Sequence, residues 1–208
     1  MLEKGFLLDM DGTLADTLGV LYGAYCELLY EFKAIPTYSE FESLSGGTIE
    51  EAIHIIKSKH SILESKTELM SIHRALYSDK HMRCPPTPGA VEFLEVAHGK
   101  GIPCCLVTSA SDDDAHAWLQ HSGFAKFFEG VISGSCVGKK KPHPEPYLMG
   151  AEQIALAPSE CIALEDSASG ISAALSAGCR TFSVGDVKDA RITTFPSLKE
   201  AATHLLYD

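Results

Sequence analysis

The chain has 208 residues, of which 45% are hydrophobic and 22% charged, and its formal net charge is −11. A chain of this length buries enough apolar surface to fold as one large domain or two small ones without disulfide bonds. Its acidic balance argues against nucleic acid and anionic membranes as partners, because both bind concentrated basic surfaces.

The cysteines and the apolar runs indicate the compartment. The seven cysteines are odd in number and scattered along the chain, so we expect free thiols in a reducing environment. No apolar stretch approaches the roughly 20 residues that span a bilayer. The short apolar run after Lys4 does not fit the core of a signal peptide with its cleavage site. We therefore expect a soluble, cytoplasmic protein.

The first predicted element is a strand over residues 5–9, which leads into Asp9-Met10-Asp11-Gly12-Thr13. Two carboxylates this close to a buried strand end repel each other unless a cation or hydrogen-bond donors compensate. A divalent metal ion would provide that compensation, and Gly12 allows the sharp turn that such a site needs. An Asx turn that caps the strand explains the Asp-x-Asp-Gly part of this run, residues 9–12, equally well.

The next segment, residues 17–83, has the apolar spacing of helices and no convincing strand. A run with three prolines over residues 84–89 then marks the boundary at the end of this helical segment. Apolar residues recur at helical spacing at Leu18, Leu21, Tyr22, Tyr25, Leu28, Leu29 and Phe32, and again at Ile49, Ala52, Ile53 and Ile56.

The rest of the chain alternates short apolar runs with amphipathic helices, a pattern typical of a parallel sheet covered on both faces. With the first strand, the predicted strands are 5–9, 103–108, 130–133, 161–165 and 180–184. The predicted helices are 89–100, 112–122, 146–154, 168–177 and 197–206, and glycines at 101, 123 and 178 stand where three of them should end.

Polar residues at the carboxyl ends of these strands are the candidate site, because open parallel sheets bind ligands there. They are Asp9 and Asp11, Thr108 and Ser109, and Glu165 and Asp166, and Lys141 lies in the connection before the fourth strand. Carboxylates, a hydroxyl and a lysine are together suited to hold a metal ion and a phosphoryl group. Alone, Thr108 also fits a structural strand residue, and the Glu165-Asp166 pair fits a helix cap.

The order of these runs resembles that of a known family. The runs are Asp9-Met10-Asp11-Gly12-Thr13, Leu106-Val107-Thr108-Ser109, Lys141-Pro142-His143-Pro144-Glu145-Pro146-Tyr147 and Leu164-Glu165-Asp166-Ser167-Ala168-Ser169-Gly170-Ile171. They resemble the four motifs of the haloacid dehalogenase-like (HAD) hydrolase superfamily, and the helical segment is similar to the cap of its phosphatase and beta-phosphoglucomutase-like branch. The resemblance implies an α/β fold: a Rossmann-like, doubly wound parallel sheet (HAD-like core) over 1–15 and 84–208, with an inserted all-helical cap domain over 16–83.

The resemblance also implies catalytic roles for Asp9, Asp11 and Lys141. Asp9 is expected to attack phosphorus and form an aspartyl-phosphate. Asp11 is expected to protonate the leaving oxygen and then to activate water, and Lys141 to neutralise the charge shared by the nucleophile and the transferring group.

Binding roles follow for the remaining strand-end residues. Thr108 and the Ser109 amide are expected to hold the phosphoryl oxygens. Asp166, with Glu165 beside it, is expected to complete a Mg²⁺ site with Asp9 and the Asp11 carbonyl, because Mg²⁺ prefers hard oxygen ligands.

Asp11 points to phosphate esters, because haloacid dehalogenases lack an acid at that position. Leu21 and Ile49 stand where the phosphoglucomutases of this branch have a histidine and an arginine. We therefore expect a magnesium-dependent phosphatase, a phosphoric monoester hydrolase of the HAD-like class, that acts on a small phosphorylated metabolite such as a sugar phosphate or a phosphoglycolate-like acid. A sugar phosphomutase of the beta-phosphoglucomutase type is the alternative, and a non-catalytic binding protein ranks third.

A cap loop is expected to supply substrate contacts. It consists of Ser45, Gly46, Gly47 and Thr48, which would reach the site when the cap closes and excludes water. The expected partner is the metabolite itself, with no nucleic acid and no membrane, and the expected assembly is a monomer or a weak homodimer.

Overall fold

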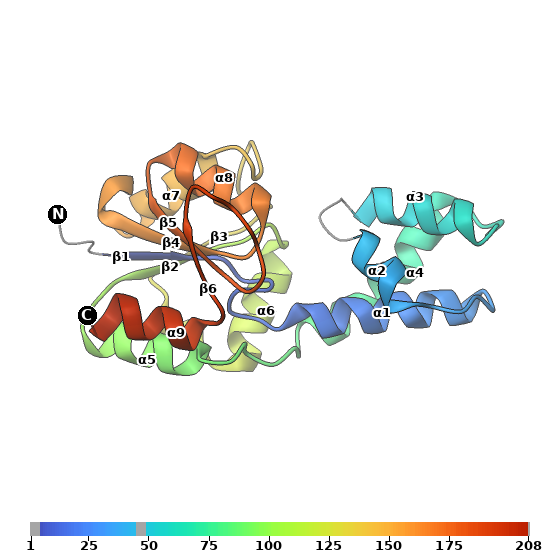
Figure 1. Cartoon of the computed structure of the whole chain (residues 1–208), viewed down its shortest axis with the longest axis horizontal. Coiled ribbons are helices and arrows are strands. Elements are labelled where there is room, and N and C mark those ends of the chain that lie inside the picture. Colours follow the sequence, from blue (N-terminus) through green and yellow to red (C-terminus); the bar gives the residue numbers. More distant parts are fainter. Residues whose placement is uncertain (1–4, 45–48, 208) are drawn as a thin grey trace. The chain divides into compact units, whose positions relative to one another are not determined.

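A computed structural model describes residues 5–44 and 49–207. The chain divides into two compact units, which are drawn in Figure 1. The α/β unit comprises Met1–Asp16 and Pro85–Asp208, and the helical unit comprises Thr17–Cys84. Because the helical unit interrupts the α/β unit in sequence, the first strand is followed by an excursion of 68 residues (17 through 84).

The α/β unit is built on a parallel sheet of six strands in the order β3-β2-β1-β4-β5-β6. All five predicted strands are confirmed, and β6 is an additional short strand at the edge. It was missed because three partly exposed residues carry no clear alternating pattern. The bounds are β1 Gly5–Leu8, β2 Cys104–Val107, β3 Gly130–Ile132, β4 Cys161–Glu165, β5 Arg180–Val184 and β6 Thr193–Phe195.

The central strand, β1, lies between β2 and β4, and all residues of these three strands are buried. Continuous apolar strands of this kind belong to a sheet that is covered on both faces. Strand order reverses beside β1, because the chain proceeds outward to β3 on one side and to β6 on the other. This is the switch point at which doubly wound sheets bind their ligands.

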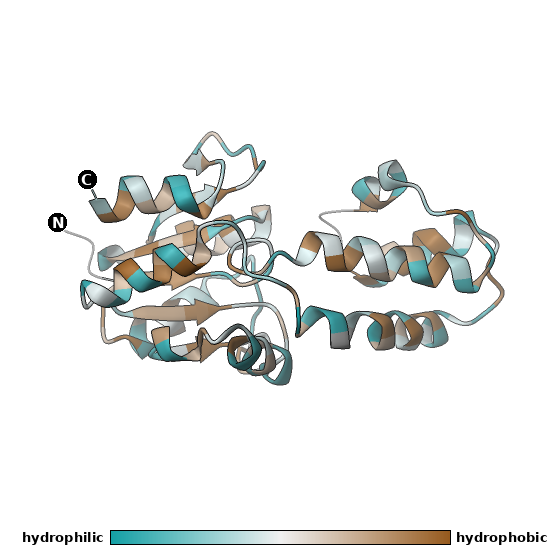
Figure 2. Ribbon diagram, turned by 90° about the horizontal axis from the view of Figure 1, so that it is seen from below, coloured by the Kyte–Doolittle hydropathy of each residue, from teal (hydrophilic) through white to brown (hydrophobic). Residues whose placement is uncertain are grey.

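Helices cover both faces of the sheet. Figure 1 shows α7 and α8 on one face and α5 and α9 on the other. Figure 2, seen from below, shows hydrophilic and hydrophobic residues alternating along α5 and α9. The bounds are α5 Ala90–Gly99, α6 Asp112–Ser122, α7 Glu145–Gln153, α8 Ala168–Ala177 and α9 Leu198–Ala202, with a π-helical turn over Thr203–Tyr207 and 3₁₀ turns over Ala125–Phe127 and Pro158–Glu160.

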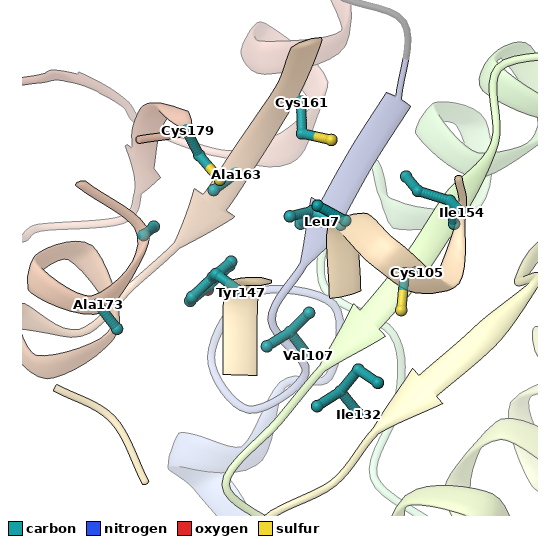
Figure 3. Close-up of a cluster of buried hydrophobic side chains, with 12 residues drawn as sticks. Leu7, Cys105, Val107, Ile132, Tyr147, Ile154, Cys161, Ala163, Ala173 and Cys179 are labelled. Atoms are coloured by element: carbon teal, nitrogen blue, oxygen red, sulfur yellow. The ribbon is translucent and has the colours of Figure 1, made fainter. Parts of the chain in front are cut away.

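A cluster of buried side chains joins the sheet to α7 and α8. Leu7 and Val107 come from β1 and β2, Tyr147 from α7 and Ala173 from α8. Figure 3 shows the Tyr147 side chain among them. Aromatic packing reaches the opposite face as well, where the rings of Phe6 and Phe93 meet edge to face at 4.9 Å.

The helical unit has a core of its own, made by residues such as Leu28, Ile53 and Leu69. Its helices are α1 Thr17–Glu31, α2 Tyr38–Leu44, α3 Ile49–Lys59 and α4 Lys66–His81. The buried Glu40 carboxylate ties these helices together, because His60 Nε2 lies 2.9 Å from its Oε1 and the Tyr25 hydroxyl also binds it. No strand occurs in the described part of this unit, as predicted.

Two further expectations concern the cysteines and the presence of membrane-spanning helices. All seven cysteines are free thiols, and Cys136 is exposed while Cys84, Cys104, Cys105, Cys161 and Cys179 are buried. Across residues 5–44 and 49–207, we find no helix with the length and hydropathy to cross a bilayer.

Gly89 precedes α5 with a φ of 89°, and a Cβ atom there would lie 2.4 Å from the Lys199 backbone nitrogen of α9. We expect Gly89→Ala to lower the free energy of unfolding by about 2 kcal/mol or more, because it combines left-handed strain with a backbone clash. Gly99→Ala is the control, since the Gly99 Cβ position is open and alanine stabilises a helix by up to about 1 kcal/mol. Urea unfolding of both variants checks this, and equal stabilities would contradict the described packing of α5 on α9.

Candidate active site

Asp9 follows the central strand directly and sits between two other strand ends. Its backbone N–H continues the β1–β4 pairing by donating to the Leu164 carbonyl at 3.1 Å. The pairs Leu8–Leu106 and Leu8–Leu164 place Asp9, one residue later, level with the end of β2 on one side and with Glu165 on the other. Asp9 is 6% exposed, so its carboxylate is largely removed from water at the switch point.

A tight turn after Asp9 brings Asp11 and Gly12 to the same edge of the sheet. The Met10 carbonyl accepts hydrogen bonds from the N–H groups of Leu14 and Ala15, at 2.9 and 2.8 Å. Gly12 has a φ of 80°, and a Cβ atom on it would lie 1.8 Å from Asp166 Oδ2. Glycine is therefore required at this position, both for the turn and for the close approach of the Asp166 carboxylate.

Lys141 joins three strand ends through one ammonium group. Its Nζ donates to Asp9 Oδ1 at 2.6 Å, to the Val107 carbonyl at 2.9 Å and to Glu165 Oε1 at 2.5 Å. These acceptors belong to the ends of β1, β2 and β4, and the lysine side chain is 3% exposed. The predicted convergence of Asp9, Lys141 and the motif after β4 is therefore present in the fold.

Glu165 lies deeper than Asp166. It is fully buried, and its Oε1 accepts from Lys141 and, at 2.7 Å, from the Tyr147 hydroxyl. Its Oε2 accepts from the backbone N–H and the hydroxyl of Ser167, at 3.2 and 2.9 Å. Ser167 also caps α8, because its Oγ accepts from the Gly170 N–H, so the sequence-level alternative of a helix cap applies to Ser167 and not to the two acids.

The electrostatic state of the site is set by burial and by crowded negative charge. Burial, followed by the charge of Glu165, raises the pKa of Asp9 well above its ordinary value. The same two causes, followed by the charge of Asp11, raise the pKa of Asp166 to about 7. Burial alone would lower the pKa of Lys141, but the charges of Asp9 and Glu165 outweigh it and hold that pKa above its usual range. Several carboxylates thus share one ammonium group and need further positive charge.

A divalent cation fits this donor set. Oxygen atoms of Asp9, Glu165 and Asp166 lie within 4.8 Å of one another, and carboxylate oxygens are the ligands that Mg²⁺ prefers. A bound cation would reverse the unfavourable electrostatics that raise the pKa values of Asp9 and Asp166. The predicted metal ligands Asp9, Glu165 and Asp166 are therefore gathered, and Asp11 lies in the adjoining turn.

Thr108 and Ser109 follow β2 at the same edge. Thr108 is buried, and its Oγ1 accepts from the Ala110 N–H at 3.0 Å, so the hydroxyl helps to shape its own loop. Ser109 is exposed. A Cβ atom on Gly134 would lie 2.4 Å from the Ser109 carbonyl, which shows how closely the loop after β3 packs on this one. Both residues thus follow the strand that pairs with β1.

Two sequence-level candidates have other outcomes. The predicted substrate loop, Ser45, Gly46, Gly47 and Thr48, lies outside the described residues. His143, which is near Lys141 in sequence, has its Nδ1 bonded to the Glu145 N–H at the start of α7.

Tyr147 is the site residue that sequence reasoning missed. It stands in the third motif run, but its role was not recognised, because its helical position also fits a core residue. A buried tyrosine needs a partner for its hydroxyl, and here that partner is Glu165. The Val107 carbonyl was missed as well, since a backbone group carries no sequence signal.

Comparisons with known proteins agree with this architecture. The profile of a family described as haloacid dehalogenase-like hydrolase matches residues 6–184. Hexitol phosphatase A of Escherichia coli is 31% identical over 198 residues, which cover 89% of this chain and 85% of that protein. The phosphorylated carbohydrates phosphatase of Thermotoga maritima is 30% identical over 179 residues, covering 84% and 82%. The crystal structure of beta-phosphoglucomutase from Clostridium difficile has a TM-score of 0.75 at 24% identity, covering 100% of this chain and 98% of that one.

Asp166→Asn tests the charge crowding in the metal-free protein. An acid whose pKa is raised on folding binds its proton more tightly in the folded state, so stability falls as pH rises from about 4 toward the folded pKa. That folded pKa is about 7 for Asp166, and the amide removes this titration. We expect the free energy of unfolding of Asp166→Asn to fall less steeply than that of the wild type between pH 5 and pH 7, measured by urea unfolding in the presence of a chelator.

The same variant should bind Mg²⁺ at least about tenfold more weakly in a calorimetric titration, because it loses a charged ligand. Glu95→Gln, an equal loss of charge at an exposed position of α5, should match the wild type in both measurements. Steeper pH dependence or unchanged Mg²⁺ affinity in Asp166→Asn would contradict the description of the site.

Proposed function

The chain belongs to the haloacid dehalogenase-like hydrolase family, and we propose that it is a magnesium-dependent phosphatase that hydrolyses a small phosphorylated metabolite. One observation carries the proposal: Lys141 Nζ bridges Asp9 and Glu165 at 2.6 and 2.5 Å, at the strand ends where Asp166 also lies. This places a buried carboxylate next to a fixed positive charge, which is the arrangement that nucleophilic attack on a phosphate monoester requires.

In the first half of the reaction, Asp9 attacks phosphorus. A new bond forms between a carboxylate oxygen of Asp9 and phosphorus while the bond from phosphorus to the ester oxygen breaks. Lys141, held at Asp9 Oδ1, fixes the orientation of the nucleophile and neutralises part of the negative charge that approaches it. Asp11 donates a proton to the departing oxygen, so the leaving group is an alcohol.

In the second half, water cleaves the aspartyl-phosphate. Asp11, now deprotonated, takes a proton from the attacking water while the water oxygen bonds to phosphorus. The bond from phosphorus to the Asp9 oxygen breaks, which releases inorganic phosphate and regenerates the Asp9 carboxylate. Thr108 and the Ser109 N–H are assigned to the phosphoryl oxygens because they directly follow β2, the strand beside β1. Two carboxylates in one turn can thus act as nucleophile and as acid and base.

The Mg²⁺ ion is assigned to Asp9, Asp166 and the Asp11 carbonyl. When bound, it supplies positive charge that polarises the phosphoryl oxygens. The crowding of carboxylates in the site supports this assignment, since burial and like charge otherwise disfavour their ionised forms.

The proposed substrate class is a phosphorylated sugar or polyol, or a phosphoglycolate-like acid. Support comes from the names of the two relatives, which act on hexitol phosphates and on phosphorylated carbohydrates. We assign residues 16–83 as the cap domain that selects among these compounds. The free thiols are in keeping with the reducing cytoplasm.

A sugar phosphomutase of the beta-phosphoglucomutase type is the second candidate, because beta-phosphoglucomutase from Clostridium difficile has the same fold. Leu21 on α1 and Ile49 at the start of α3 stand where that branch has a histidine and an arginine. An apolar side chain neither transfers a proton nor binds a distal phosphate, so hydrolysis is the favoured reaction.

Asp9→Asn and Asp11→Asn test the mechanism. We expect Asp9→Asn to lower the release of inorganic phosphate by on the order of 10³-fold or more, because it removes the nucleophile. Asp11→Asn should slow release by on the order of 10²-fold or more, the usual contribution of acid-base catalysis. Phosphate release is measured on a panel of hexitol phosphates, sugar phosphates and phosphoglycolate, with and without Mg²⁺.

Glu95→Gln serves again as the control for loss of a carboxylate and should release phosphate at the wild-type rate. Equal release by wild type and Asp9→Asn would refute the nucleophile. A product isomer formed without net phosphate release, and only with a bisphosphate activator, would establish the mutase instead.

A further inference from the structure

Tyr147 presents a rigid hydrogen-bond donor to the active site. It lies in the first turn of α7 and is 0% exposed. Its ring packs in the core cluster with Leu7, Val107 and Ala173, as Figure 3 shows. Because core packing fixes the ring, the hydroxyl has one position, from which it donates to Glu165 Oε1 at 2.7 Å.

The hydrogen-bonding capacity of Glu165 is fully used. An ionised carboxylate has about four lone-pair positions. Oε1 accepts from Tyr147 and Lys141, and Oε2 accepts twice from Ser167. A metal ion could bind Glu165 only by displacing one of these donors, and none of them is solvent.

The position of the Lys141 ammonium group depends on this carboxylate. An ammonium group has three donors, and those of Lys141 go to Asp9, to the Val107 carbonyl and to Glu165. The Tyr147 ring centroid lies 5.3 Å from Nζ, within the range of a cation-π contact. Tyr147 therefore contacts the lysine directly through its ring and indirectly through Glu165.

Gly170 shows that the fold reserves space for Glu165 in this orientation. A Cβ atom on Gly170 would lie 1.8 Å from Glu165 Oε1 and 2.2 Å from Oε2. The carboxylate is thus packed against the first turns of α8, with its oxygens turned toward Ser167 and Tyr147.

We propose that Tyr147 is a positioning residue: its hydroxyl, together with Ser167, fixes Glu165 as the partner of Lys141, so that Glu165 orients the lysine and does not bind the metal ion. The metal ion is then held by Asp9, Asp166 and the Asp11 carbonyl. This inference rests on the proposed function, because the orientation of Lys141 affects turnover only if Asp9 receives a phosphoryl group.

Tyr147→Phe removes the hydroxyl and keeps the ring. Lys141 then acts on a transferring group from a less fixed position, so we expect kcat to fall roughly tenfold, the size of effect for a lost hydrogen bond to a charged group, with KM within about twofold of wild type. Thr181→Val is the matched control, since it removes a buried hydroxyl of the α/β unit, which donates to the Cys179 carbonyl. Thr181→Val should keep kcat within about twofold of wild type, and an equal kcat in both variants would leave Tyr147 with a packing role only.

Mg²⁺ affinity without substrate tests the assignment of Glu165 independently of turnover. In calorimetric titrations, Glu165→Gln and Tyr147→Phe should bind Mg²⁺ within about threefold of wild type, whereas Asp166→Asn should bind at least about tenfold more weakly. If Glu165→Gln weakens binding as much as Asp166→Asn does, Glu165 is a metal ligand and the proposal is overturned. Should Glu165→Gln fail to fold, Tyr147→Phe decides the question through its kcat and its Mg²⁺ affinity.

The phosphatase activity and the positioning role of Tyr147 are tested by separate measurements. If the wild type releases no phosphate from any compound of the panel, the proposed function fails, and the Mg²⁺ titrations together with solvent exchange of the Lys141 ammonium protons still decide the positioning role. Faster exchange in Tyr147→Phe than in Thr181→Val supports it, and equal exchange contradicts it.

Discussion

The Lys141 ammonium group bonds oxygen atoms at the ends of three neighbouring strands: Asp9 after β1, Val107 of β2 and Glu165 of β4. A buried positive charge needs such partners, and buried carboxylates need a positive charge, so each makes the other tolerable away from water. These ion pairs still leave an excess of negative charge, because oxygen atoms of Asp9, Glu165 and Asp166 gather around one ammonium group, and this excess suits a divalent cation.

The rest of the α/β unit supports this contact. Buried apolar strands hold β1 between β2 and β4, which brings their ends together at the switch point. Two glycines provide the necessary space, because a Cβ atom on Gly12 would strike Asp166 and one on Gly170 would strike Glu165. Tyr147 connects the site to the core, with its ring in the apolar cluster and its hydroxyl on Glu165.

The helical unit, Thr17–Cys84, is stabilised separately. Its apolar core and the hydrogen bonds of the buried Glu40 carboxylate are made by residues of this unit alone. Substitutions in this core therefore leave the residues at the strand ends of the α/β unit unchanged. The proposed phosphatase chemistry accordingly resides in the α/β unit, and substrate choice is assigned to the insertion.

The sequence by itself determined the strands β1 to β5 and the helices between β1 and β2, and it named Asp9, Lys141 and Asp166 as candidate site residues, because periodicity and strand-end motifs are local properties. It missed β6, whose three partly exposed residues depend on the neighbouring strand for their conformation. Only the tertiary structure decided which group faces which. Glu165 and Asp166 are adjacent acids of the same motif, and the sequence does not distinguish them. In the structure, Glu165 accepts hydrogen bonds from four donors, whereas the Asp166 carboxylate lies against Gly12. Burial and hydrogen-bond geometry arise from elements far apart in the chain, so the parts played by Tyr147 and Glu165 emerge only when α7, α8 and three strands are packed together.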